Sequence, residues 1–273
     1  MTCQLPATTE TLSGELPTSG DYQKGVKYIT DMWPNLPNLP SEYVLPLTTN
    51  PLLVSHASIP VVDLSGLNGS AESRMRTIQA IDSACAEWGI FGMQLKIASA
   101  LSEALGLDGD YIEKSLGGGF QVVGSNYYAP CPEPHRTLEI PDHSDHGGLT
   151  VLMQNDVDGL QVEHDGEWVS VGIVPGSFVV NIGDYMEILS NGWYKTLKHR
   201  GVTNKQRTRI SIAVGNGPAL TSTVAPASPL VDEKNEIKCH NHITYKGYME
   251  LHQNGTTRGK TPMQVMIDLQ ADK

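Results

Sequence analysis

The sequence predicts a mainly β protein with flanking helices, whose core is a sandwich or barrel of the jelly-roll kind. From residue 118 onwards, short apolar runs of strand length follow one another. Turn residues separate these runs at Asp158-Gly159, Asp165-Gly166, Pro175-Gly176, Asn191-Gly192 and Asn204-Lys205. Many short strands at such spacing are typical of two packed sheets or a closed one. Apolar residues at helical spacing precede and follow this part of the chain.

Before residue 118 the sequence predicts an extended arm, followed by strands and helices. Residues 1–60 are rich in Pro, Thr, Ser and Asn, and we expect one short helix near 24–32. IPVVDLSGL (59–67) predicts a short buried strand that Ser-Gly ends, and GIFGMQ (89–94) predicts a second strand.

Two helices are expected on either side of the second strand. In the first, at 71–88, apolar residues recur at helical spacing: Met75, Ile78, Ile81, Ala84 and Cys85. The second is LKIASALSEALGL (95–107), with Gly106 as its C-cap. No turn residue separates this helix from the strand at 89–94, which is locally inconsistent. Either one broken helix runs from about 71 to 105, or a segment is missing here.

The β-rich part contains seven strand-like runs, and a helical tail follows it. The runs are FQVVGSNYYAP, TLEIPDHSDHGGLTVLMQ, GLQVEH, EWVSVGIV, SFVVNIGD, YKTLKHRGV and TRISIAVGN. After a polar stretch, helices are expected at 245–252 and 261–270. The predicted organisation is an N-terminal arm and helical region at 1–117, a β core at 118–220 and a C-terminal helical tail at 221–273.

Composition excludes several classes of function. The formal charge of -11 over 273 residues argues against nucleic acid or an anionic membrane surface as the partner. No apolar run approaches the ~20 residues that span a bilayer, and no signal peptide is expected. The four cysteines are far apart, which suits a reducing compartment. We therefore expect a cytoplasmic monomer that acts on small molecules.

The stretch HSDHGGLTVLMQ (143–154) contains two candidate metal ligands. His143 and Asp145 are two residues apart, so on a strand they would point to the same face. His199, in the run YKTLKHRGV, is the best candidate for a third ligand. Two imidazoles and one carboxylate on one face of an octahedral ion leave three positions open, which favours Fe(II) with a bidentate keto acid and O₂. The glycines after Asp145 would let the chain turn closely beside the site.

A candidate anion clamp follows on the next predicted strand. Arg209 and Ser211 in TRISIAV share a strand face. Two neutral histidines and one aspartate leave a divalent site with a charge of about +1, which suits an anionic chelating co-substrate. An arginine with a neighbouring hydroxyl could bind the distal carboxylate of such a co-substrate through charge-assisted hydrogen bonds.

Each of these residues has a simpler explanation when taken alone. An H-x-D pair is a metal site in about one case in ten, a lone His199 is more often a hydrogen-bonded histidine, and a lone Arg209 is more often salt-bridged or solvated. Their occurrence together and in order, within one strand-rich segment, favours a site.

Competing clusters are weaker. His143 and His146 are three residues apart, a spacing that does not align two side chains on a strand. His240 and His242 have no third ligand nearby, and Asp142 would point away from His143 into solvent. The sequence contains no Gly-rich phosphate loop and no G-x-S-x-G nucleophile motif.

Several of these motifs together resemble the plant-type Fe(II)- and 2-oxoglutarate-dependent dioxygenases. The segment 143–218 carries the ligands and the clamp, NYYAPCPEP (126–134) is similar to the motif before the metal strand, and IPVVDLSGL is similar to the family's N-terminal strand. The resemblance is dense over 106–218 and looser over 24–92.

The resemblance implies a double-stranded β-helix core that holds Fe(II) and 2-oxoglutarate, with ascorbate in a supporting role. It implies these roles: metal binding and catalysis by His143, Asp145 and His199, binding of the C5 carboxylate by Arg209 and Ser211, and contact with the co-substrate by Asn126 and Tyr128. The implied reaction consumes O₂ and 2-oxoglutarate, yields succinate and CO₂, and hydroxylates, desaturates, demethylates or ring-closes an organic substrate. A compound of plant specialised metabolism is expected, phenylpropanoid- or flavonoid-like.

The chain departs from the family at two places. Family members carry several dozen more residues, including an Asn-His-Gly motif, where this chain joins the strand at 89–94 to the helix at 95–107. We therefore predict an internal deletion near residues 92–96, with exposed apolar surface and reduced stability. Glu139 and Asp142 replace the usual Gly and Pro and add acidic charge beside the iron strand.

Two other classes of function remain open. One is a catalytically inactive, shortened family member that retains metal or partner binding. The other is a cupin-like protein with zinc or manganese, which would not need the Arg209 and Ser211 pair.

Overall fold

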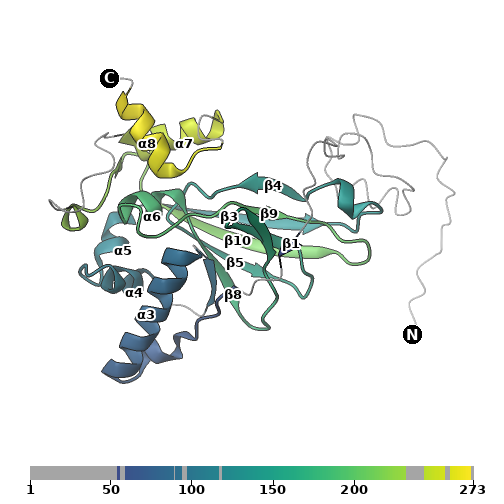
Figure 1. Cartoon of the computed structure of the whole chain (residues 1–273), viewed down its shortest axis with the longest axis horizontal. Coiled ribbons are helices and arrows are strands. Elements are labelled where there is room, and N and C mark those ends of the chain that lie inside the picture. Colours follow the sequence, from purple (N-terminus) through teal and green to yellow (C-terminus); the bar gives the residue numbers. More distant parts are fainter. Residues whose placement is uncertain are drawn as a thin grey trace, which may run out of the picture.

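Two five-stranded sheets face each other in the computed structural model (Figure 1), which describes residues 54–55, 59–88, 90–93, 97–116, 119–231, 243–255 and 259–271. The first sheet has the order β1-β7-β6-β9-β4 and the second the order β2-β8-β5-β10-β3. Neighbouring strands are antiparallel except β1 and β7, which are parallel. The jelly-roll prediction is therefore confirmed.

The strands of these sheets are β1 (Val54–Ser55), β2 (Ile90–Met93), β3 (Phe120–Tyr128), β4 (Ile140–His143), β5 (Leu149–Gln154), β6 (Leu160–His164), β7 (Glu167–Ser170), β8 (Phe178–Ile182), β9 (His199–Gly201) and β10 (Arg209–Gly217). A separate ribbon pairs β11 (Thr223–Val224) with β12 (Ile243–Thr244). Helices and 3-10 turns connect them: η2 (Leu64–Asn68), α3 (Ala71–Glu87), α4 (Ile97–Ala104), α5 (Tyr111–Leu116), η3 (Pro134–Arg136), α6 (Asp184–Leu189), η4 (Ser228–Leu230), α7 (Tyr245–Gln253) and α8 (Pro262–Ala271).

Two of the turns predicted from the sequence lie at the predicted residues. Asp165 and Gly166 join β6 to β7 and have φ angles of 51° and 78°. A two-residue hairpin loop with both φ angles positive matches the twist of the strands it joins, and Asp-Gly is among its preferred sequences. Asn191 and Gly192, with φ angles of 53° and 78°, turn the chain after α6 in the same way.

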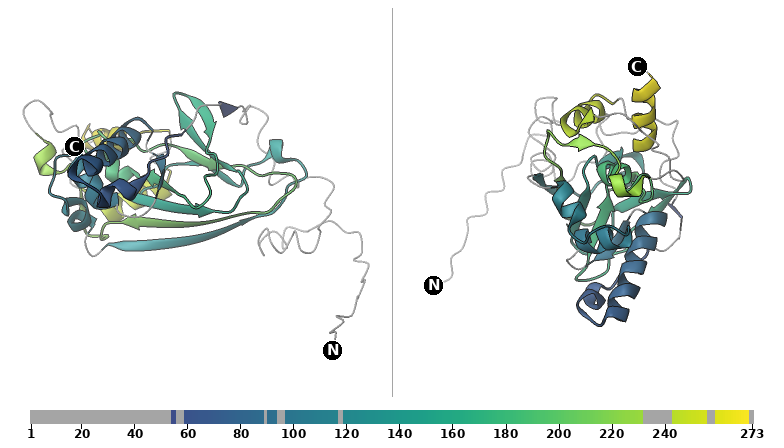
Figure 2. Two further views of the ribbon diagram at one scale, coloured as in Figure 1. Left: turned by 90° about the horizontal axis from the view of Figure 1, so that it is seen from below. Right: turned by 90° about the vertical axis from the view of Figure 1, so that its left-hand side faces the viewer.

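The helices gather at one end of the sandwich and share one core with it (Figures 1 and 2). Ser70 caps α3 by accepting a hydrogen bond from the Ser73 amide at 3.2 Å. The core joins side chains of α3, α4, α6, α7 and α8 to those of β5 and β8. Its fully buried members include Ile81, Leu101, Met186, Tyr248 and Met266. Among the described residues, every helix is too short or too polar to cross a lipid bilayer.

The structure corrects three expectations in the N-terminal half. IPVVDLSGL is not a strand: only Val61 forms a bridge, and Asp63 caps the 3-10 helix η2 by accepting from the Ser65 amide at 2.9 Å. Met75 does not face the core but is 61% exposed on α3. A single broken helix over 71–105 is also wrong, because β2 lies between α3 and α4 and pairs with β8.

Other expectations are confirmed or lie outside the described part of the chain. The strand at 89–94 is β2, the helix at 95–107 is α4, and Gly106 follows it with a φ angle of 71°. The two C-terminal helices are α7 and α8. The helix near 24–32 and the pair His240 and His242 lie outside the described residues. The division into three regions stays a prediction.

Apolar side chains are exposed on the outer face of the second sheet. Val123 and Tyr127 of β3, Ile210 of β10 and Met153 of β5 share this face. Val123 and Tyr127 are four residues apart on one strand, Ile210 is the register partner of Tyr127, and Met153 is the register partner of Ile212, two residues from Ile210. Val123 is 65% exposed and Met153 46% exposed. That an internal deletion exposes apolar surface stays a prediction.

Candidate metal centre

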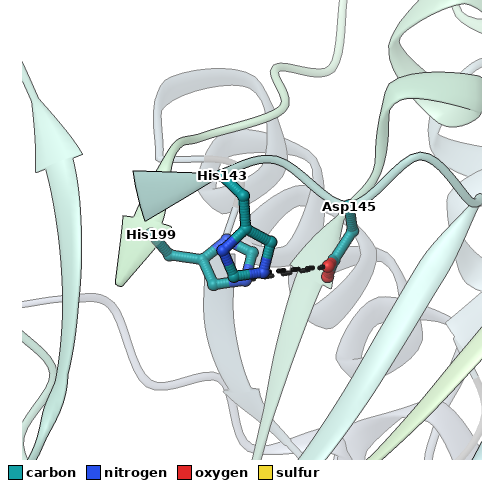
Figure 3. A group of neighbouring side chains, drawn as sticks. All are labelled: His143, Asp145 and His199. Atoms are coloured by element: carbon teal, nitrogen blue, oxygen red, sulfur yellow. Dashed lines mark ion pairs between the residues drawn. The ribbon is translucent and has the colours of Figure 1, made fainter. Parts of the chain in front are cut away.

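Two histidines and one aspartate meet where β4 and β9 pair. His143 ends β4, His199 begins β9, and the two are register partners. Their Nε2 atoms lie 3.8 Å and 3.7 Å from Oδ1 of Asp145, as Figure 3 shows. One ligand atom from each of the three side chains lies within 4.8 Å of the other two. The structure therefore brings together the three residues that the sequence predicted as metal ligands.

Asp145 reaches this cluster by a route that differs from the expected one. β4 ends at His143, and Asp145 lies two residues later, in the turn that leads to β5. Strand alternation therefore does not place the two side chains together; the turn does. The turn passes close to β10, because a Cβ on Gly147 would lie 2.6 Å from the carbonyl oxygen of Asn216. The glycine after Asp145 thus permits the close approach that the sequence suggested.

Backbone carbonyls orient both imidazole rings. Nδ1 of His143 lies 2.9 Å from the Pro141 carbonyl oxygen, and Nδ1 of His199 lies 3.3 Å from that of Leu197. A ring that donates from Nδ1 keeps its lone pair on Nε2, the atom that faces Asp145 here. Burial also lowers the pKa of His199 below its ordinary value, which favours the neutral, metal-binding form.

The neighbours of Asp145 keep its carboxylate ionised. Burial raises its pKa, but the electrostatic interactions with the His199 and His143 rings and hydrogen bonds from Thr150 and Asn181 outweigh burial, so the pKa lies below its ordinary value. Nδ2 of Asn181 donates to Oδ2 of Asp145 at 3.4 Å. Asn181 of β8 and Thr150 of β5 are register partners, so the second sheet supplies both hydrogen bonds. Neither residue was predicted from the sequence.

This set of donors fits a non-haem Fe(II) ion. Two neutral imidazoles and one carboxylate occupy one face of an octahedral ion and leave the opposite face open. The Fe(II) centre predicted from the sequence is therefore compatible with the residues present.

The four residues predicted to bind the co-substrate share the inner face of the second sheet. Arg209 pairs in register with Tyr128, and Ser211 pairs with Asn126. Nδ2 of Asn126 donates to Oγ of Ser211 at 3.3 Å, and Cζ of Arg209 lies 5.1 Å from the centre of the Tyr128 ring. Arg209 and Ser211 are both 2% exposed. The sequence thus identified a real cluster, with a buried cation beside a hydroxyl group.

Arg209 has two further partners that sequence reasoning missed. Its Nη1 lies 3.2 Å from Oε2 of Glu139, and its Nη2 donates to Oε1 of Gln154 at 3.1 Å. The side chain of Arg209 is 3% exposed and that of Glu139 is 1% exposed. Burial raises the pKa of Glu139 to about 8, although Arg209 opposes this shift. The sequence showed acidic charge near the iron strand, but not that this carboxyl group contacts the clamp.

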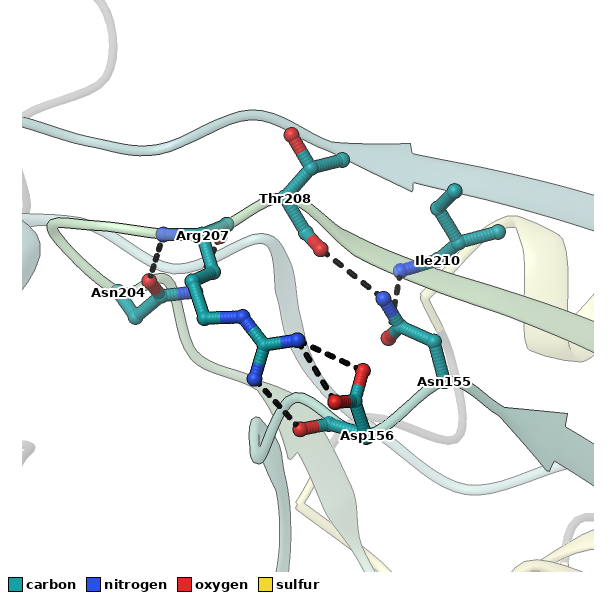
Figure 4. A network of polar contacts seen from close by, with 6 residues as sticks. All are labelled: Asn155, Asp156, Asn204, Arg207, Thr208 and Ile210. Atoms are coloured by element: carbon teal, nitrogen blue, oxygen red, sulfur yellow. Dashed lines mark hydrogen bonds and ion pairs between the residues drawn. The ribbon is translucent and has the colours of Figure 1, made fainter.

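A surface network fixes the start of β10, and with it Arg209 (Figure 4). The Arg207 guanidinium binds both carboxylate oxygens of Asp156, at 2.7 Å and 2.8 Å. The side-chain amide of Asn155 accepts from the Ile210 backbone amide at 3.1 Å and donates to the Thr208 carbonyl at 3.0 Å. The chain on either side of Arg209 is therefore tied to the end of β5.

The C-terminal helix α7 packs against the metal-bearing turn. Nδ1 of His146 lies 2.6 Å from the Tyr245 hydroxyl, and Nε2 of His252 lies 3.2 Å from the Ser144 carbonyl oxygen. His146 therefore has a structural partner and does not join His143 in a metal site. Asp142 is exposed, as expected.

The chain is similar in sequence to known oxygenases. Residues 119–218 match the 2OG-Fe(II) oxygenase superfamily. The chain is 45% identical over 156 residues to Protein DOWNY MILDEW RESISTANCE 6 of Arabidopsis thaliana, covering 56% of this chain and 46% of that protein. It is 40% identical over 171 residues to Flavanone 3-dioxygenase 2 of Oryza sativa subsp. japonica, covering 62% of this chain and 49% of that protein. The chain thus spans about half the length of these curated relatives.

Solved structures share the fold. The crystal structure of JOX2 in complex with 2OG, Fe and JA superposes with a TM-score of 0.74 at 24% identity, over 85% of this chain and 95% of that one. The dioxygenase for auxin oxidation of rice gives a TM-score of 0.54 at 20% identity, over 77% of this chain and 99% of that one. Residues 119–218 thus carry a 2OG-Fe(II) oxygenase domain, and about half of the chain is similar to plant oxygenases of this kind.

Proposed function

We propose that this chain is an Fe(II)- and 2-oxoglutarate-dependent oxygenase in which His143, Asp145 and His199 bind the iron. The observation that carries the proposal is the convergence of these three ligand atoms within 4.8 Å, in the same sandwich as a buried Arg209 and Ser211. Bound iron would supply the activation of O₂, coupled to oxidative decarboxylation of the keto acid.

The protein residues orient the co-substrate. Arg209 and Ser211 would hold the C5 carboxylate of 2-oxoglutarate through charge-assisted hydrogen bonds. Asn126 keeps the Ser211 hydroxyl in place through its 3.3 Å hydrogen bond. Tyr128 lies under the guanidinium and limits its movement. Asp145, ionised and hydrogen-bonded by Asn181, offsets part of the metal charge.

The organic substrate is a plant specialised metabolite, and we propose a phenylpropanoid or flavonoid-like compound. Two relatives support this class: Flavanone 3-dioxygenase 2 and Oxoglutarate-dependent flavonoid 7-O-demethylase 1 of Ocimum basilicum, to which the chain is 38% identical over 147 residues. The fold and metal centre are compatible with hydroxylation, desaturation, demethylation or ring closure. A cytoplasmic location and a monomeric state remain part of the proposal.

A second candidate is a catalytically inactive, shortened family member that still binds metal or a partner. One observation favours it: Arg209 already contacts an acidic side chain, that of Glu139. Succinate formation that depends on Fe(II) and 2-oxoglutarate would exclude this candidate.

The first test needs no knowledge of the substrate. Fe(II) and 2-oxoglutarate, added anaerobically to the purified chain, should produce a visible metal-to-ligand charge-transfer band. His199→Ala should abolish the band, while His135→Ala, at an exposed histidine of η3, should leave it unchanged. If the folded protein gives no band, whether Fe(II) or 2-oxoglutarate is added first, the proposed site is contradicted.

A further inference from the structure

The cation that should bind the co-substrate carboxylate is already in contact with a carboxyl group of the same chain. Glu139 Oε2 lies 3.2 Å from Arg209 Nη1, and both side chains are almost completely buried. The ion pair between Arg207, two residues before Arg209, and Asp156 differs because its side chains are 56% and 76% exposed. Solvent screens an exposed ion pair such as Arg207 and Asp156. Solvent cannot reach the contact between Glu139 and Arg209, because both side chains are buried.

Glu139 and 2-oxoglutarate present the same chemical group to Arg209. The glutamate side chain ends in two methylene groups and a carboxyl, and so does the distal half of 2-oxoglutarate. The guanidinium of Arg209 can therefore donate hydrogen bonds to either carboxyl group in the same geometry. The two carboxyl groups cannot occupy the same face of the guanidinium at once.

The internal contact leaves hydrogen-bonding capacity unused. Glu139 Oε1 and Arg209 Nε are buried and have no hydrogen-bond partner within the described part of the chain. A buried contact that involves a charged guanidinium is favourable only when its remaining hydrogen bonds are also satisfied. A carboxylate that binds two guanidinium nitrogens at once, as arginine commonly permits, would be the better partner. The contact is therefore one that a ligand can replace.

The backbone of Glu139 is held independently of its contact with Arg209. The Glu139 amide donates to the Gly201 carbonyl at 2.8 Å, which ties its backbone to the strand that begins with His199. A Cβ on Gly201 would lie 3.2 Å from the Cβ of Glu139, so the backbone segments are closely packed. The main chain beside the metal centre can thus stay in place while the carboxyl group leaves Arg209.

We propose that Glu139 is an internal competitor for the distal carboxylate of the co-substrate, and that it determines which 2-oxo acids the site accepts. The inference rests on the proposed function, since it takes Arg209 as the co-substrate clamp. 2-Oxoglutarate must displace Glu139 in order to bind. A 2-oxo acid without a distal carboxylate, such as pyruvate, chelates iron without contacting Arg209 and meets no competition.

The test compares two keto acids in three variants. Fe(II)-loaded protein is titrated anaerobically with 2-oxoglutarate and, separately, with pyruvate, and the charge-transfer band gives each Kd. Glu139→Ala removes the competitor, and Glu139→Gln keeps its size without its carboxyl group. Glu167→Gln is the matched control, because it removes one carboxylate from an exposed position on β7 of the first sheet. Circular dichroism verifies that each variant is folded.

The expected result is selective. The Kd for 2-oxoglutarate should fall about tenfold in Glu139→Ala, the change that the loss of one competing charge-assisted hydrogen bond produces. It should fall by a smaller factor in Glu139→Gln and stay unchanged in Glu167→Gln. The Kd for pyruvate should be the same in all of these proteins.

Two results would overturn the inference, and they can be told apart. If both Glu139 variants bind 2-oxoglutarate no more tightly than the wild type, or if pyruvate binding tightens equally, Glu139 does not compete for the clamp, and the proposed function survives. If no protein gives a band with either acid, the metal centre itself is not formed. The proposed function then fails, and the competition fails with it.

Discussion

Replacing Glu139 by glutamine should make the chain less sensitive to pH between 5 and 7. Burial raises the pKa of Glu139 from 4.5 to about 8 in the folded protein. Because the folded state then holds a proton that the unfolded state has released, stability falls as pH rises from the unfolded pKa towards the folded one. The side-chain amide of the Glu139→Gln variant cannot titrate, so the variant should lack this loss.

The size of the effect follows from the two pKa values. Each unit of difference corresponds to about 1.4 kcal/mol, so the loss for this one group between pH 5 and pH 7 is about 2.5 kcal/mol. Within the described part of the chain, the other ionisable groups that interact with Glu139 are Arg209, Tyr128 and Cys131. Burial holds the pKa of Tyr128 and that of Cys131 above their ordinary values, so neither titrates in this window.

The assay is urea unfolding at pH 5 and at pH 7, for the wild type, Glu139→Gln and the exposed control Glu167→Gln. The change in unfolding free energy between the two pH values should be about 2.5 kcal/mol less unfavourable in Glu139→Gln than in the wild type. The control should behave like the wild type. Equal pH dependence in all three proteins would mean that Glu139 is ionised throughout this range, as a fully formed ion pair with Arg209 would be, and the reasoning would be refuted.

Three further substitutions test other parts of the structure. Gly159→Ala should weaken 2-oxoglutarate binding in the charge-transfer titration and spare pyruvate, because a Cβ there would lie 2.5 Å from Cδ of Arg209; an unchanged Kd would show that the clamp can shift freely. Leu101→Ala should lower the unfolding free energy by about 2–5 kcal/mol, since the side chain is fully buried, and a loss below about 1 kcal/mol would place Leu101 outside the core. Tyr248→Phe removes the 3.0 Å hydrogen bond to the buried Asp184; we expect a loss of about 1–3 kcal/mol at pH 7 in thermal unfolding, and a neutral result would show that another donor replaces the hydroxyl.

Local sequence patterns were sufficient wherever structure depends on neighbours in the chain. The Asp165-Gly166 turn, the apolar period of α3 and the cap at Gly106 each depend on a few adjacent residues, and each is found in the structure. The pattern failed at IPVVDLSGL, where the apolar run predicted a strand but the Asp63 side chain caps a 3-10 helix. It also failed at Met75, which has the right period but no partner element to cover it.

In the candidate site, too, residue type and order predicted some features, and long-range contacts could not be predicted. His143, Asp145 and His199 were identified from residue type and order, although Asp145 reaches the cluster through a turn rather than a strand. The contact between Glu139 and Arg209 joins residues 70 positions apart. Arg209 belongs to β10 of the second sheet, whereas Glu139 precedes β4 of the first sheet. Their contact therefore depends on the register within each sheet and on how the two sheets face each other. That information is not contained in any local pattern.

The packing of α7 on the turn after β4 has a consequence for the apoprotein. Tyr245 and His252 reach from this helix to His146 and to the Ser144 carbonyl, on either side of Asp145. The helix therefore acts as a buttress, and the order of the turn is thermodynamically linked to the order of the C-terminal region. By reciprocity, an ion that fixes Asp145 must stabilise α7 by the same free energy with which α7 strengthens the binding of the ion. Loosening the last helices would therefore weaken metal binding without altering any ligand.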